Sequence, residues 1–294
     1  MEIIRTVSWM KQAARQARAE NHVIGMVPTM GALHEGHLSL LRRAKSNCSK
    51  VIASIFVNPT QFSPNEDLSK YPRTFETDVA KLEAAGVDIL FAPDAKEIYP
   101  PGFTTYVTVE GLSDRLEGRS RPGHFRGVAT VVHKLFEIAQ PQYAFFGRKD
   151  AQQARILQRM LQDLNADVEL VLCPIVREPD GLALSSRNAY LNPEERRAAT
   201  ILYRSLEAAR SEIAAGTRDA LSLEDSVRNV LAKERLARVD YVEVADADKF
   251  ESVARLNAHA AAYLLLAVFI GKTRLIDNLL FEPASDSGEL RCSL

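Results

Sequence analysis

The chain has 294 residues, which is enough for one large domain or two medium ones with well-buried cores. Its formal net charge of −1, from 37 basic and 38 acidic residues, excludes a global basic field that would attract nucleic acid or an anionic membrane. The three cysteines, Cys48, Cys173 and Cys292, are too scattered for a disulfide framework or a zinc site, and they favour a reducing cytosol.

The first residues of the chain place apolar side chains at helical spacing, with no continuous apolar segment. Val7, Met10, Ala14 and Ala17 show this spacing, so no secretory signal peptide is predicted. The longest apolar run, residues 260–270, is too short to span a bilayer and is predicted to be a buried strand. We therefore expect no association with a membrane.

Strands and helices alternate through the first part of the chain. Apolar runs predict strands at 23–28, 51–57, 88–92, 142–146 and 168–173, and helical patterns fill 37–47, 73–86, 127–139 and 150–164. Such alternation implies right-handed βαβ units. The fold class is therefore α/β, with a doubly wound, Rossmann-like parallel sheet.

The pattern changes near residue 175. The sequence then predicts a long charged helix at 193–215, a second helix at 222–236, and strands at 239–246, 261–271 and 273–281. Helices followed by consecutive strands predict a smaller α+β domain with an antiparallel sheet. We therefore expect domains at 1–175 and 176–294, with residues 283–294 as a frayed, flexible tail.

The stretch MVPTMGALHEGHLSLL, residues 26–41, carries the first of these strands through a turn into a helix. In open α/β sheets, ligands bind beyond the carboxyl ends of the strands. Gly31 and Gly36 let the backbone approach a ligand, and a helix that begins near Gly36 offers N–H groups to a phosphate. His34 and His37, three residues apart, can project over the same phosphates.

That stretch has none of the commoner nucleotide or metal signatures. It lacks the G-K-[ST] of a Walker A loop and the G-x-G-x-x-G of a dinucleotide site. It also supplies only two ligands for zinc, with no further ligand at an evident spacing. In isolation it would be a capped turn with two solvated histidines, and only the strand, the glycines and the helix around it favour a site.

The H-x-G-H turn resembles the phosphate-binding signature of the nucleotidyltransferase superfamily, which includes class I aminoacyl-tRNA synthetases. The longer string PTMGALHEGH resembles the family of pantoate-beta-alanine ligases. Further blocks resemble the motifs of that family in order: FVNPTQF at 56–62, YPRT at 71–74, HFRGVATVV at 124–132, FFGRKDAQQ at 145–153 and REPDGLALSSRNAYL at 177–191. The resemblance implies an AMP-forming ligase that condenses pantoate with beta-alanine through a pantoyl adenylate, releasing diphosphate, in pantothenate and coenzyme A biosynthesis.

The resemblance also implies the residues of the site. The implied catalytic residues are His37, His34, Lys149 and Arg187, which place positive charge on the phosphates with the help of Mg²⁺. Pantoate is implied to bind Asn58, Gln61 and Gln153, and beta-alanine to bind Gln61. ATP is implied to bind Met30, Gly31, Ala32, Leu33, His34, Glu35, Gly36, His37, Gly147, Arg148, Lys149, Asp150, Val176, Leu184, Ser185, Ser186 and Arg187. The ligands of the metal stay unassigned.

Each block also has a plainer interpretation. VNPTQF would be a turn capped by Asn58, GRKD a solvated helix start, and SSRN a polar loop before a helix. Their positions favour function, with residues 176–294 closing over the reactive adenylate as a lid. Two residues depart from the family pattern: Arg148 replaces a usual acidic residue, and Leu184 replaces a frequent methionine. The direction of the Arg148 side chain is left open.

Three other functions share parts of the pattern. An adenylyltransferase that leaves AMP on a phosphorylated product has the same turn, but the neutral glutamines favour an acid as substrate. A tRNA synthetase is disfavoured by the short chain, the balanced charge and the lack of a lysine-rich loop. A nucleotide sensor would not need Lys149, His37 and Gln61, which are all present. The resemblance further implies a cytosolic homodimer held by the N-terminal domain, with no nucleic-acid partner.

Overall fold

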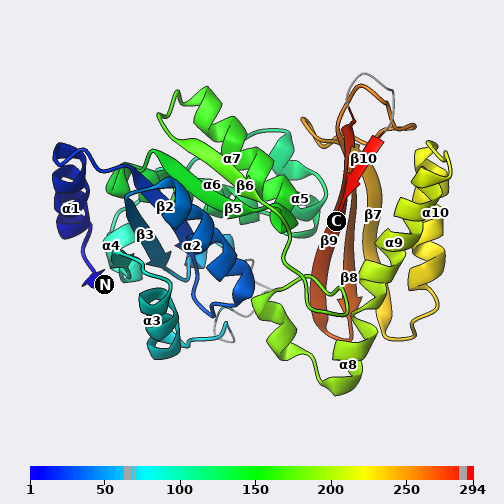
Figure 1. Ribbon diagram of the computed structural model, residues 1–294, viewed down its shortest axis with the longest axis horizontal. Helices are drawn as coiled ribbons and strands as arrows, with labels where there is room; N and C mark the ends of the chain where they lie inside the picture. Colours follow the sequence, from blue (N-terminus) through cyan, green and yellow to red (C-terminus); the bar gives the residue numbers. More distant parts are fainter. Residues whose placement is uncertain (63–67, 69–70, 285–289) are drawn as a thin grey trace. The chain divides into compact units, whose positions relative to one another are not determined.

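A computed structural model describes residues 1–62, 68, 71–284 and 290–294, which form two compact units (Figure 1). Unit 1 contains Met1–Arg148 and Gln152–Pro174, and unit 2 contains Lys149–Ala151 and Ile175–Leu294. Unit 1 is built on a parallel sheet and unit 2 on an antiparallel sheet. None of the helices in the described ranges is long and apolar enough to cross a bilayer.

The sheet of unit 1 has six strands, and every pair of neighbours in it is parallel. Its strands are β1 (Glu2–Ile4), β2 (Ile24–Thr29), β3 (Lys50–Ile55), β4 (Ile89–Phe91), β5 (Tyr143–Gly147) and β6 (Glu169–Cys173), in the order β1-β4-β3-β2-β5-β6. This order confirms the predicted doubly wound α/β fold. β1 was not predicted, because three residues are too few for an apolar pattern.

Helices cover both faces of this sheet. They are α1 (Val7–Ala19), α2 (Glu35–Asn47), α3 (Phe75–Ala84), α4 (Ala95–Ile98), α5 (Glu117–Ser120), α6 (His124–Ala139) and α7 (Ala151–Asp163). The chain crosses the sheet in one direction through α2 and α3 and in the other through α1, α6 and α7, so right-handed crossovers place these two groups on opposite faces. Leu41 of α2 and Leu82 of α3 accordingly share one apolar cluster with Val27 and Phe145.

The strand order places the candidate site at the middle of the sheet. β2 lies between β3 and β5. From β2 the chain continues to β3 on one side of the sheet, and from β5 it continues to β6 on the other side. Such a reversal is a topological switch point, where open α/β sheets bind their ligands. Since all these strands are parallel, the segments after β2, β3 and β5 meet at the same edge.

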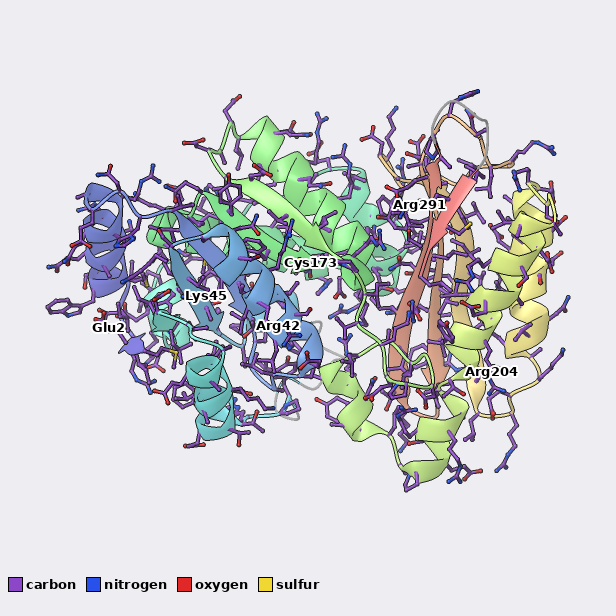
Figure 2. The ribbon with its side chains drawn as sticks, viewed as in Figure 1. Glu2, Arg42, Lys45, Cys173, Arg204 and Arg291 are labelled. Carbon is purple, nitrogen blue, oxygen red and sulfur yellow. The ribbon has the colours of Figure 1, made fainter. Side chains whose placement is uncertain are left out.

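The surface of α2 is held by ion pairs. Figure 2 labels Arg42 and Lys45 on this helix; Arg42 pairs with Glu35, and Lys45 Nζ lies 3.2 Å from Asp88 Oδ2. Exposed pairs of this kind contribute little to stability. They do show that both cations face acidic neighbours, and that Arg42 is paired with Glu35 in the first turn of the helix.

Unit 2 combines three helices with a four-stranded antiparallel sheet. Its elements are α8 (Pro193–Ala198), α9 (Ile201–Ala214), α10 (Ala220–Leu231), β7 (Ala237–Asp246), β8 (Ala262–Ile270), β9 (Thr273–Pro283) and β10 (Leu290–Ser293), with the strand order β10-β9-β8-β7. β8 is buried along almost its whole length, which confirms the predicted buried strand at 260–270. The smaller α+β architecture predicted for this part is also confirmed.

Three details of unit 2 differ from the prediction. The helix predicted at 193–215 is interrupted: the N–H groups of Thr200 and Leu202 bond three residues back, to Arg197 and Ala199, which tightens the chain between α8 and α9. The helix predicted to 236 ends at Leu231, and the turn after it delivers the chain into β7.

The third difference lies in the C-terminal tail. Residues 290–293, predicted to be frayed, form β10 and pair with residues 280–283 of β9. Leu290 and Cys292 also pack against the apolar cluster of the unit. Pairing and packing outweigh the polar composition of the tail here, whereas residues 285–289, also predicted to be flexible, lie outside the described residues.

Candidate active site

The turn after β2 takes up left-handed backbone conformations just before the two histidines. Gly31 has φ of +86° and Ala32 has φ of +51°. Glycine adopts this region freely, whereas Ala32 needs contacts that hold it there. The hydroxyl of Thr29 accepts from the Gly31 N–H at 3.1 Å and donates to the carbonyl of Ser54 at 2.6 Å. β2 and β3 thus fix the start of the turn.

His34 and His37 lie together at the first turn of α2. His34 is the N-cap residue, and the two ring centroids are 4.1 Å apart. The backbone N–H of His34 donates to Nδ1 of His37 at 3.3 Å. When the His37 ring is neutral, its proton is therefore on Nε2. The Nε2–H donor of His37 and the positive end of the helix dipole thus lie together at the start of α2, an arrangement that suits binding of a phosphate chain.

The segment after β3 carries two predicted pantoate ligands. Asn58 is 1% exposed, and its Nδ2 donates to Gln61 Oε1 at 3.1 Å and to the carbonyl of Gly127 at 3.0 Å. Gln61 Nε2 in turn contacts Sδ of Met30 at 3.0 Å. The structure therefore brings Met30, Gln61 and Asn58 together at the edge where β2 and β3 end.

Tyr99 completes this amide pair and was not predicted from the sequence. Its hydroxyl donates to Oδ1 of Asn58 at 2.8 Å and lies 3.2 Å from Oγ1 of Thr60. Burial raises the pKa of the Tyr99 phenol, so it stays a neutral donor at neutral pH. Tyr99 belongs to none of the family blocks, and no local pattern connects it with Asn58.

The HFRG block supports the same segment from α6. Nδ1 of His124 donates to the carbonyl of Gln61 at 2.9 Å, and its Nε2 lies 3.0 Å from Nη1 of Arg121. A Cβ atom on Gly127 would lie 2.3 Å from the carbonyl oxygen of Thr60, so only glycine permits this approach. The block resembles a family motif, and in the structure it holds the segment that carries Gln61.

Two neighbouring glutamines at the start of α7 differ in what they contact. Gln152 is 2% exposed and donates to the carbonyls of Leu112 and Arg115, at 2.8 and 2.9 Å. The Gln153 side chain is half-buried and has no hydrogen bond to any described residue. The amide of Gln152 is therefore used within the fold, whereas that of Gln153 can serve a ligand.

The remaining predicted ATP ligands that precede α7 lie at the carboxyl end of β5. Gly147 is the last residue of β5, the strand beside β2, and Arg148 follows it; both are half-buried. They continue into a short 3₁₀ turn, Arg148–Asp150, whose Asp150 is exposed. A Cβ atom on Gly147 would meet nothing within 4 Å, so open space faces this backbone.

Unit 2 carries the other predicted ATP ligands on a hairpin turn and the segment after it. The N–H of Leu184 donates to the carbonyl of Val176 at 3.0 Å, so these two residues, eight apart in sequence, are neighbours. Ser185 then begins the 3₁₀ helix Ser186–Tyr190, and its Oγ accepts from the N–H of Arg187 at 3.3 Å. Three predicted phosphate ligands thus follow one another at a helix start.

Two adjacent residues of β9 hold these segments. The carboxylate of Asp277 accepts from Nη1 and Nη2 of Arg177, at 2.6 and 2.9 Å, at the base of the hairpin. Nδ2 of Asn278 donates to the carbonyl of Lys149 at 2.9 Å. Asp277 and Asn278 are 3% and 1% exposed, and neither was predicted to support the site. The family motifs stop before β9, so they give no signal for either residue.

A parallel doubly wound sheet with a glycine turn, paired imidazoles and a hydrogen-bonded amide pair at its switch point defines a nucleotide-binding α/β enzyme. The sequence profile of the pantoate-beta-alanine ligase family matches residues 2–280. The chain is 55% identical to the pantothenate synthetase of Roseiflexus sp. (strain RS-1) over 282 residues, 96% of this chain and 100% of that one. It is 52% identical to the pantothenate synthetase of Thermotoga neapolitana over 278 residues, 95% and 99% of the two chains.

Solved structures agree with this assignment. The pantothenate synthetase of Thermus thermophilus matches with a TM-score of 0.89 at 45% identity, over 95% of this chain and 98% of that one. The ligase of Francisella tularensis, complexed with beta-gamma ATP and beta-alanine, matches with a TM-score of 0.77 at 36% identity, over 95% and 97%. The chain belongs to the pantoate-beta-alanine ligase family, and it is an ATP-dependent ligase that condenses pantoate with beta-alanine.

Proposed function

We propose that the condensation passes through a pantoyl adenylate held at the switch point of unit 1. A carboxylate oxygen of pantoate attacks the α-phosphorus of ATP, and the bond from that phosphorus to the bridging oxygen breaks, which releases diphosphate. The amine of beta-alanine then attacks the acyl carbon and loses a proton, and AMP leaves from pantothenate. One observation carries this proposal: the paired imidazoles and the Asn58–Gln61 pair follow the carboxyl ends of two paired parallel strands, β2 and β3, and Gln61 contacts Met30 of the turn before the imidazoles.

The cations are assigned to the departing phosphates. Negative charge develops on the bridging oxygen as diphosphate leaves, and preorganised donors stabilise that charge most strongly in the transition state. His37, with its proton on Nε2, and His34 supply donors from unit 1. Lys149 and Arg187 of unit 2 are proposed to add cations to the same phosphates, and residues 176–294 are proposed to close over the adenylate as a lid.

The neutral amides are assigned to pantoate. Gln61 and Gln153 can bond its hydroxyls and carboxylate without withdrawing charge from the attacking oxygen. The unused amide of Gln153 supports this role, and Gln61 is proposed to meet beta-alanine as well. Asn58, predicted as a third pantoate ligand, is 1% exposed and bonded to Gln61, Gly127 and Tyr99, so it is proposed to hold the Gln61 amide in place for pantoate. ATP is proposed to contact residues 30–37, 147–150, 176 and 184–187, with Asp150 on its ribose.

Mg²⁺ is proposed to enter together with ATP. In sites of this kind, Mg²⁺ is held largely by substrate phosphates and water. No group of three or more His, Cys, Asp or Glu side chains within the described ranges could hold a metal ion. The ion is therefore assigned to the nucleotide, as part of the substrate, and no protein ligand is named for it.

A cytosolic homodimer formed through unit 1 completes the proposal. Residues 104–109, TTYVTV, are rich in β-branched side chains and pair with no strand in the described part of the chain. Such a segment readily pairs with a second copy. All three cysteines are free thiols, which fits a reducing compartment. Light scattering should give twice the chain mass of 32.6 kDa, and a monomer mass at micromolar concentration would contradict this part.

Isotope transfer tests the adenylate directly. Pantoate labelled with ¹⁸O in its carboxylate should give AMP that carries one label, because the attacking oxygen stays on phosphorus when the amide forms. AMP and diphosphate should appear only when pantoate is present. Unlabelled AMP would exclude a pantoyl adenylate, and stoichiometric ADP would place the attack at a different phosphorus.

A further inference from the structure

A buried carboxylate of α3 holds the turn that precedes the two histidines. Asp78 is 1% exposed, and its Oδ2 and Oδ1 accept from the N–H groups of Ala32 and Leu33, both at 2.8 Å. Thr74 Oγ1 also donates to Oδ2, at 3.0 Å. Three residues further along α3, Nζ of Lys81 donates to the carbonyl of Leu33 at 2.6 Å.

These contacts explain why the turn keeps its conformation. Left-handed residues at Gly31 and Ala32 direct successive N–H groups toward one point, which makes an anion-binding concavity. Here the anion is Asp78 of the same chain, so the N–H groups of Ala32 and Leu33 are engaged within the protein. The fit is close, because a Cβ atom on Gly31 would lie 3.1 Å from Oδ2 of Asp78.

We propose that Asp78, assisted by Lys81, is a positioning residue that sets both imidazoles for adenylate formation. The N–H of Leu33 donates to Asp78, and the carbonyl of Leu33 accepts from Lys81. The residue that follows Leu33 is His34. The N–H of His34 in turn holds Nδ1 of His37. A shift of the turn therefore moves both rings. This inference rests on the roles proposed above for the two histidines.

The substitution Asp78→Asn tests this inference with little change of shape, because one carboxylate oxygen becomes an NH₂ group that must face an N–H. We expect the single-turnover rate of pantoyl adenylate formation to fall about 10²-fold, since a misplacement of about 1 Å has costs of that order. The KM for pantoate should stay within about twofold of wild type. A large loss in rate with an almost unchanged KM would not result from a general loosening of the fold. Glu76→Gln is the matched control, because it removes the same charge from an exposed position of α3.

A double-mutant cycle with His37→Ala supplies the decisive readout. If Asp78 acts through the His37 ring, the two rate losses combine to much less than their product. Losses that multiply fully, or a normal rate in Asp78→Asn while His37→Ala is slow, would overturn the positioning role alone. A normal rate in His37→Ala would instead refute the proposed function.

Lys81→Gln keeps the test open if Asp78→Asn does not fold. It removes the bond to the Leu33 carbonyl from a half-buried position and leaves the Asp78 carboxylate in place. We expect a several-fold loss in the same rate, again combining to less than the product with His37→Ala. An unchanged rate, or a loss that multiplies fully, would overturn the inference.

Discussion

The two segments proposed to hold ATP are anchored in different ways. In unit 1, the turn at residues 31–33 is held through its own backbone N–H groups, directly beside the histidines. In unit 2, the hairpin at residues 176–184 is held by a side chain, Arg177, at its base. An anchor on the backbone directly before the two histidines sets their geometry, whereas an anchor remote from Ser185 chiefly stabilises the unit. Damage to the first should appear in the rate, and damage to the second in stability.

The largest effect on stability is expected at the base of the hairpin. Arg177→Met leaves the carboxylate of Asp277 buried without its cation, which costs about 3–5 kcal/mol in the free energy of unfolding. Arg196→Met is the control, since it breaks a more exposed pair with Asp180 of the same hairpin, worth about 0–1 kcal/mol. Urea unfolding would measure both variants. Equal losses would show that burial does not distinguish the two pairs.

The largest effect on rate is expected in unit 1. His37→Ala removes a donor from the departing phosphates and should slow adenylate formation about 10²–10³-fold, while ATP affinity changes little. Single-turnover kinetics and a separate measurement of ATP binding distinguish the two quantities. His259→Ala, at an exposed position of unit 2, should leave both unchanged. If the KM for ATP rose and kcat did not change, His37 would be a ground-state ligand only.

Smaller effects are expected at the pantoate amides. Gln61→Ala and Gln153→Ala each leave a polar group of pantoate unpaired, at about 1–3 kcal/mol, and should raise the KM for pantoate more than that for ATP. Gln152→Ala, next in sequence to Gln153, removes bonds to two backbone carbonyls and should lower stability instead. Weak ATP binding with normal pantoate binding would show that the acid site lies elsewhere.

The smallest effect is expected where a side chain anchors the site of unit 1. Tyr99→Phe removes one hydrogen bond to Asn58, worth about 0.5–1.5 kcal/mol, and should raise the KM for pantoate by up to about tenfold. Because burial raises the pKa of the Tyr99 phenol, the wild-type bond should persist through the usual titration range of tyrosine. Tyr143→Phe, at the amino-terminal end of β5 and so away from the carboxyl ends of the strands, is the control. Equal KM values for both variants would remove Tyr99 from the site.

Short-range patterns predicted most of the fold. Every strand and helix predicted between residues 23 and 173 is present, because strands buried on both faces appear as continuous apolar runs and helices repeat their apolar residues at helical spacing. β1 and β10 escaped prediction because segments of three and four residues are too short for a pattern, and pairing with β4 and β9 stabilises them. The interruption between α8 and α9 also escaped, since a tightened turn leaves the helical periodicity almost unchanged.

The sequence by itself determined which chemistry is available and where along the chain it occurs. Two histidines at a helix start, after a strand and a glycine turn, are a local arrangement, and so are the amides that follow the next strand. Only the tertiary structure decided what holds them: Asp78 reaches a backbone 46 residues away, Tyr99 a side chain 41 residues away, and Asn278 a backbone 129 residues away. Such partners meet because strand order and helix packing place their elements together. That placement minimises the free energy of the whole chain, and no local period records it.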